Sequence, residues 1–162
     1  MCMKYVNVNV CCFDDINSNI LNLGRTTFTA MLDSVKSKEK NGKFFIGDFN
    51  IVTFINVRGT KTGNKSDNPL DAGQRLDFKV RLTKLDSDPS NQLSYDLTNF
   101  SVDLSQKESL HHACFAYKEH VEITSVDSLS LESKGAYVIK ILVKESSKEL
   151  YDVQMIHPLY VV

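Results

Sequence analysis

The chain has 162 residues, a formal net charge of −1 and 42% hydrophobic residues. A chain of this length can bury a substantial core in one domain without disulfides or a structural metal. Its 19 basic and 20 acidic side chains give the whole molecule no general attraction to nucleic acid or to an anionic membrane. We therefore expect a single domain spanning residues 1-162, in which any binding of a polyanion would need a local patch.

The N-terminal segment lacks the features of a secretion signal. It has no basic start, and Asn7 and Asn9 interrupt its apolar run. No apolar stretch approaches the ~20 residues that a membrane helix needs. The four cysteines form no C-x-x-C pair, and the adjacent Cys11 and Cys12 would point to opposite faces of a strand. We expect a cytoplasmic protein with free thiols, without a cofactor and without membrane contact.

Two different periodicities mark the beginning of the chain. Residues 4 to 13 alternate between apolar and polar side chains, which predicts a half-buried strand. Four apolar residues then recur with the spacing i, i+3, i+4 and i+7: Phe28, Met31, Leu32 and Val35. This spacing predicts an amphipathic α-helix near residues 27-40, which Asn41-Gly42 would end.

The rest of the chain has the pattern of short strands. The run from residue 43 to 57 is rich in β-branched and aromatic residues, and Gly47-Asp48 divides it into two strands or marks a bulge. Residues 75 to 85 show the most regular alternation. A bulge near Asn99 would reconcile two registers in the next strand. The C-terminal segment predicts a hairpin that turns at residues 145 to 148.

The stretch "LSLESKGAYVIKILV" resembles the closing hairpin of immunoglobulin-like sandwich domains, in which Gly-x-Tyr opens an alternating strand. The resemblance concerns architecture, because the Cys, Trp and Cys spacing of true immunoglobulin domains is absent. The connections are mostly too short for parallel crossovers. We predict an all-β, single-domain antiparallel β-sandwich, immunoglobulin-like in broad architecture, with about eight strands and one α-helix near residues 27-40.

The stretch "NVRGTKTGNKSDNP" is one residue away from the phosphate-binding signature G-x-x-x-x-G-K-[ST]. Asn64 occupies the place of the second glycine, and the strand from Arg75 leaves no room for the helix that such a loop needs. We interpret residues 58-74 instead as a polar end loop that contacts a partner. The candidate binding residues are Arg58, Lys61, Asn64, Lys65 and Asp67.

A second set of candidates has the residue types of a metal site. His112, Cys114 and His120 would share one face of a continuous strand, and imidazole and thiolate are zinc ligands. Lys118 would lie on the same face and repel a cation. A metal-dependent protein or enzyme that uses this His/Cys strand face is therefore the alternative hypothesis.

A third set could contact a phosphate backbone. Arg75, Lys79 and Arg81 lie on the polar face of one predicted strand. Asp77 interrupts the row, and basic residues on such a face also protect a strand edge against unwanted pairing. A nucleic-acid binder is the second alternative.

These observations favour a non-catalytic interaction module that binds another protein or ligand through end loops, notably residues 58-74. No side chains are placed by spacing alone for acid–base or nucleophilic chemistry, so we do not expect an enzyme. The expected partner is another protein. Self-association through exposed strand edges also stays open.

Overall fold

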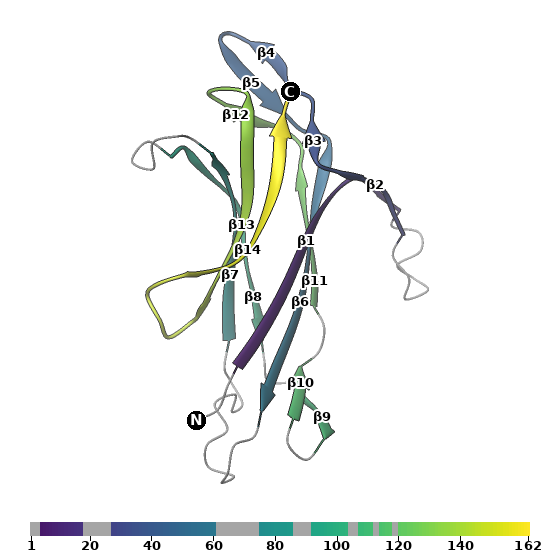
Figure 1. Cartoon of the computed structure of the whole chain (residues 1–162), viewed down its shortest axis with the longest axis vertical. Helices are drawn as coiled ribbons and strands as arrows, with labels where there is room; N and C mark the ends of the chain where they lie inside the picture. The colour runs from purple at the N-terminus through teal and green to yellow at the C-terminus, as the bar shows by residue number, and fades with distance from the viewer. Residues whose placement is uncertain are drawn as a thin grey trace.

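The computed structural model describes most of the chain, and all regular structure in the described residues is β-strand (Figure 1). The all-β class is therefore confirmed for this part of the protein. No helix in the described part is long and apolar enough to cross a membrane. The described residues are 4–17, 27–60, 75–85, 92–103, 107–111, 114–117 and 120–162.

The strands form three sheets. The β6 sheet has the order β2-β1-β6-β10-β9, with β11 also paired to β6. Its strands are β1 (Lys4–Asn17), β2 (Thr27–Leu32), β6 (Phe49–Thr60), β9 (Lys107–His111), β10 (Cys114–Tyr117) and β11 (His120–Val126). The β13 sheet has the order β3-β14-β13-β7-β8. Its strands are β3 (Ser34–Val35), β7 (Arg75–Lys84), β8 (Ser94–Asp103), β13 (Gly135–Glu145) and β14 (Asp152–Val161). The small β5 sheet joins β12 (Leu129–Leu131), β5 (Lys43–Ile46) and β4 (Lys38–Lys40).

The two larger sheets curl around one core. The sheets contact each other at β1 and β14 and again at β11 and β8, and the strands bend like half a barrel rather than forming two clearly separate layers (Figure 1). The core is built from inward-facing residues of both sheets. Those that are almost fully buried include Ile51, Ile55, Phe78, Leu82, Tyr137, Ile139, Ile141 and Leu159.

Tyr137 ties the start of β13 to the preceding segment. Its ring is fully buried, and its hydroxyl donates a hydrogen bond to the backbone carbonyl of Ser133 at 2.6 Å. Burial raises the pKa of the Tyr137 phenol, so it stays protonated. The bond satisfies a polar atom that would otherwise be buried at a penalty.

The predicted helix near residues 27-40 is not supported: the structure has β2, β3 and β4 there. The helical spacing of the four apolar residues was accidental, since Leu32 ends one strand and the buried Val35 belongs to another. Asn41 and Gly42 have positive φ angles of 55° and 74°, and they form the two-residue turn of the β4–β5 hairpin. An Asn-Gly pair is a strong hairpin signal because both residues tolerate this backbone region.

Several finer predictions can be compared directly. The break at Gly47-Asp48 and the strand from Arg75 are confirmed. The bulge expected near Asn99 lies at Leu97, because Val80 pairs with Thr98 while Arg81 pairs with Asp96. The expectation of antiparallel pairing alone was wrong, since β14 and β3 pair in parallel over two residues. These strands are distant in sequence, so the short-connection argument did not apply. The single-domain assignment stays a prediction.

Candidate functional site

One corner of the fold brings two backbone segments unusually close. The paired strands β6 and β11 continue as the pair β5 and β12 in the same register, because Phe49 pairs with Val126 and Ile46 pairs with Leu129. Between these pairs, Gly47-Asp48 lies opposite Asp127-Ser128. A Cβ atom on Gly47 would lie 2.1 Å from the carbonyl oxygen of Asp127. Only glycine, which has no Cβ atom, allows this close approach. Gly47 therefore lets the continuous pair of strands, β5–β6 with β12–β11, form a corner here.

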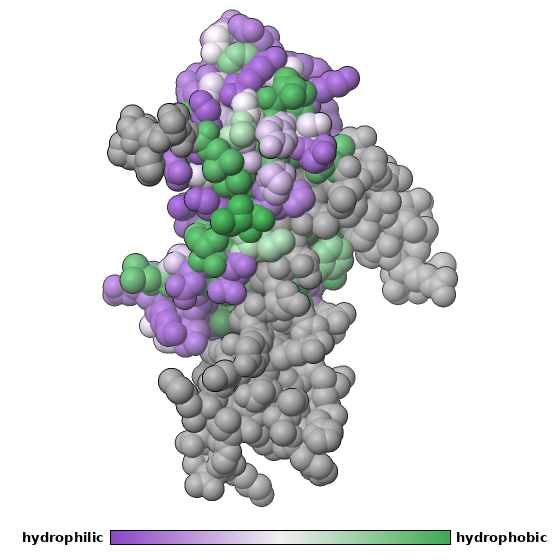
Figure 2. Space-filling view, viewed as in Figure 1, coloured by the Kyte–Doolittle hydropathy of each residue, from purple (hydrophilic) through white to green (hydrophobic). Residues whose placement is uncertain are grey.

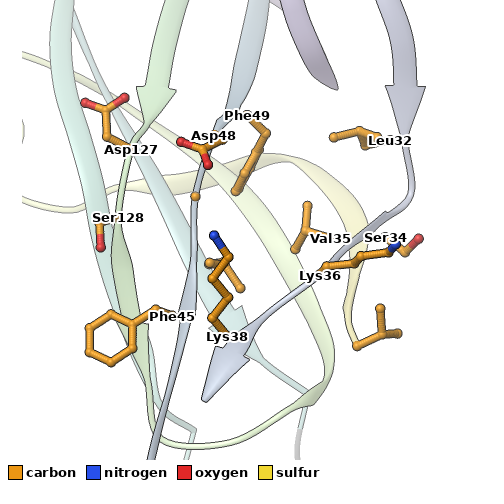
Figure 3. Close-up of a pocket in the computed structure, with 13 residues that line it drawn as sticks. Leu32, Ser34, Val35, Lys36, Lys38, Phe45, Asp48, Phe49, Asp127 and Ser128 are labelled. Atoms are coloured by element: carbon orange, nitrogen blue, oxygen red, sulfur yellow. The ribbon is translucent and has the colours of Figure 1, made fainter. Parts of the chain in front are cut away.

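A cleft of about 590 Å³ opens beside this corner (Figure 3). Its floor includes three buried side chains, Val35, Ile46 and Phe49. Its rim is polar and comes from separate parts of the sequence: the segment after β3, the Gly47-Asp48 corner and the Asp127-Ser128 corner. The β4–β5 hairpin adds Phe45 from its second strand. The cleft therefore combines an apolar floor with a charged rim.

The charges on the rim are arranged in two groups. Asp48 and Asp127 lie at the corner, while the exposed Lys36 and Lys38 lie along the neighbouring segment (Figure 3). Lys38 extends toward the Asp48 corner in this view. No ion pair within 4.0 Å joins these four side chains in the described part of the chain. Within the described part of the chain, none of these four charges is neutralised by an ion pair.

Hydrogen bonds fix the segment that carries the two lysines. The backbone amide and the hydroxyl of Ser37 both donate to the carbonyl oxygen of Val162, at 2.8 and 2.9 Å. The amide of Val162 in turn donates to the carbonyl of Val35 at 3.0 Å. This wall of the cleft is therefore built into the sheet framework and is not a free loop.

The predicted end loop lies mostly outside the described residues. Arg58 is placed in β6, where its backbone pairs with Tyr5 and Ala116, so it belongs to a strand and not to a loop. Lys61, Asn64, Lys65 and Asp67 lie outside the described part. Their role as partner contacts stays a prediction.

The proposed His/Cys face is divided between strands. Cys114 belongs to β10 and pairs with Thr60, whereas His120 begins β11 and pairs with Ile55. Five residues of β6 separate these two positions, which is about 17 Å at roughly 3.4 Å per residue. One metal ion cannot be bound by both. His112 lies outside the described residues.

His120 has local partners that account for its position. Its Nε2 lies 3.0 Å from a carboxylate oxygen of Glu122, and its ring stacks on Phe100 with 5.9 Å between centroids. In the part of the chain that is described, no group of three or more His, Cys, Asp or Glu side chains could hold a metal ion.

The three basic residues of β7 do share one face, but each has an acidic partner. Arg81 forms a two-pronged hydrogen bond with Asp96, at 2.5 and 3.2 Å, and Lys79 lies 3.3 Å from the same carboxylate. Arg75 lies 3.5 Å from Asp77. These ion pairs reduce the net charge that a nucleic-acid backbone would meet.

Hydrogen bonds and neighbouring cations lower the pKa values of both carboxyls. The hydrogen bond from Arg81 is the main reason that the pKa of Asp96 is lowered, and the pKa of Arg81 is raised by the same contact. At Asp77, partial burial raises the pKa, but hydrogen bonds from Ser101 and Ser146 outweigh it and the net pKa is lowered. Both aspartates are therefore ionised at neutral pH.

Comparisons with known proteins supply no assignment: no protein-family model matches this chain, and no curated protein is significantly similar to it. The corner cleft was missed from the sequence because its residues come from three distant segments. The sequence did contain one signal of this corner, the pair Gly47-Asp48. Its role as a corner becomes visible only when its pairing opposite Asp127-Ser128 is known.

Proposed function

We propose that this protein is a non-catalytic interaction module of β-sandwich architecture that binds another protein through end loops. The observation that supports it best is the corner cleft, in which an apolar floor lies beneath two cations and two carboxylates that form no ion pairs with one another. Protein-protein contacts commonly combine a desolvated apolar centre with a polar rim. The partner would place an apolar side chain on the floor and charged groups against the rim.

One further feature is compatible with this proposal. The hydrogen bond from Tyr137 to Ser133, four residues upstream, resembles the contact that a tyrosine makes at a strand start in immunoglobulin-like sandwiches. Such domains bind partners through loops held by a rigid sheet framework. The proposal also keeps residues 58-74 as a second partner contact in addition to the cleft.

The test is a change of charge within the cleft. We expect Lys38→Glu to lower the recovery of specific binding partners about tenfold, since a lost charge contact at an interface costs on the order of 1.4 kcal/mol. The control is Lys148→Glu, which alters an exposed lysine on the β13–β14 turn, away from the cleft. The measurement is quantitative mass spectrometry of proteins captured from the source cells by each variant.

Equal recovery by wild type, Lys38→Glu and Lys148→Glu would remove the cleft from the proposal. In the same assay, replacement of residues 61-74 by a short Gly-Ser linker tests the loop, and unchanged capture would remove it. Failure of wild-type protein to retain any specific partner would contradict the proposed function as a whole.

A further inference from the structure

A bulge on β14 brings several apolar side chains to one face of the β13 sheet. Ile141 pairs with Met155, but Leu142 pairs with Val153, so Gln154 is the extra residue. Without this bulge Val153 would face the core together with Met155, because side chains alternate along a strand. The bulge turns Val153 outward, onto the same face as Ile156.

The resulting surface is apolar and exposed. Val153, Ile156 and Tyr160 are 49%, 53% and 53% exposed, and all three follow one strand. Leu150, in the adjoining turn, is 83% exposed. Figure 2 shows hydrophobic residues gathered on this side of the molecule among hydrophilic ones. Large apolar side chains grouped on one face mark interaction sites more often than scattered ones do.

The same face carries basic residues, and among the described residues Lys140 forms neither an ion pair nor a contact with an aromatic ring. Lys140 lies between Arg81 and Ile156 in the pairing register. The carboxylate of Asp96 is already shared by Arg81 and Lys79. No carboxylate of the described residues forms an ion pair with Lys140. Lys140 is half-buried, and no described carboxylate compensates its charge on this surface.

The neighbouring cations differ from Lys140 in this respect. Lys79 and Lys144 both lie over the ring of Tyr151, each 5.1 Å from its centroid. Such contacts offset part of the charge of an ammonium group. Lys140 makes no comparable contact with a described residue. A partner that complements this surface would therefore carry a negative charge, and that charge would lie opposite Lys140.

The edge of β14 is poorly suited to pairing with an added strand. The amides of Tyr160 and Val162 already donate to the carbonyls of Asp33 and Val35. Pro158, two residues before Tyr160, has no amide hydrogen to offer. A partner would therefore lie across the face of the sheet and would not extend it.

From these observations we propose that the outer face of β13 and β14 binds an acidic, apolar segment of another protein. A carboxylate of the segment pairs with Lys140, while its apolar side chains cover Val153 and Ile156. This inference rests on the charge pattern of the β13 sheet, and it is independent of the corner cleft.

A peptide of alternating glutamate and leucine, with blocked ends, is the probe. Titration into isotope-labelled protein should shift backbone NMR signals of β13 and β14. We expect Lys140→Gln to weaken binding about tenfold, and Ile156→Ser to weaken it by a similar factor. Lys134→Gln is the matched control, because Lys134 is exposed in the segment before β13 and contacts Phe44 instead. Its affinity should equal that of the wild type.

Three results would overturn the proposal. One is an absence of shifts on β13 and β14 with the glutamate peptide. Another is equal binding of a peptide in which lysine replaces glutamate, since the recognition would then not depend on charge. The third is binding to phosphatidylserine vesicles without binding to the peptide, which would identify the surface as a membrane contact. A wild-type-like NMR spectrum of each variant shows that folding is retained.

Discussion

At the scale of single residues, the carboxylate of Asp96 forms ion pairs with two cations of β7. It accepts hydrogen bonds from Arg81 and lies 3.3 Å from Lys79, and its side chain is 43% exposed. Its lowered pKa means that the folded state favours the ionised carboxylate. Because the group is substantially solvated, its contribution to stability is limited to the range measured for surface ion pairs.

We expect Asp96→Asn to lower the free energy of unfolding at neutral pH by about 0.5–1 kcal/mol. The stabilisation by Asp96 is complete above the pKa of an unfolded aspartate, about 4, and is lost as pH falls through the lower pKa of the folded state. The difference between variant and wild type should therefore shrink below about pH 4. Urea unfolding at a series of pH values measures it. A difference that is constant from pH 7 to pH 2.5 would contradict the assignment.

At the scale of elements, the alternation of apolar and polar residues predicted strands well where one face of the strand is buried and the other is exposed to solvent. The strand from Arg75 has buried Leu76, Phe78, Val80 and Leu82 in strict alternation. The helix predicted near residues 27-40 was wrong because it was assigned from the spacing of four apolar residues alone, and the structure has short strands there. Its hairpin signal, Asn41-Gly42, was present but was interpreted as a helix end. Pairing with β1, which decides the conformation of β2, is not a local property.

The corner of the β5–β6 and β11–β12 ribbon leads to a prediction about backbone space. Gly47→Ala should lower the free energy of unfolding by about 1–3 kcal/mol, the range for overpacked sites, because the new methyl group would meet the Asp127 carbonyl. The control is Gly42→Asn. Gly42 has open space around it, and asparagine tolerates its φ of 74°. Thermal or urea unfolding should show a clear loss for the first variant alone. Equal stability of the two variants would mean that the corner is not tightly packed.

At the scale of the whole molecule, the sheets present two separate candidate surfaces. The corner cleft lies where the β6 and β5 sheets meet, and the apolar face lies on the outside of the β13 sheet. Neither could be predicted from the sequence, because each combines residues that only strand pairing brings together. The basic residues of β7 could be placed on one face from their alternation, but their acidic partner Asp96 comes from β8. The central claim is that the protein works by binding partners and carries no resident metal or cofactor.

Native mass spectrometry of protein purified without chelator or affinity metal tests this claim most directly. We predict a mass equal to that of the polypeptide, or of the polypeptide with a bound protein partner, without stoichiometric metal or small molecule. A stoichiometric addition of the mass of zinc, iron, copper or an organic cofactor would contradict the account and would direct attention to the residues around His112 and Cys114.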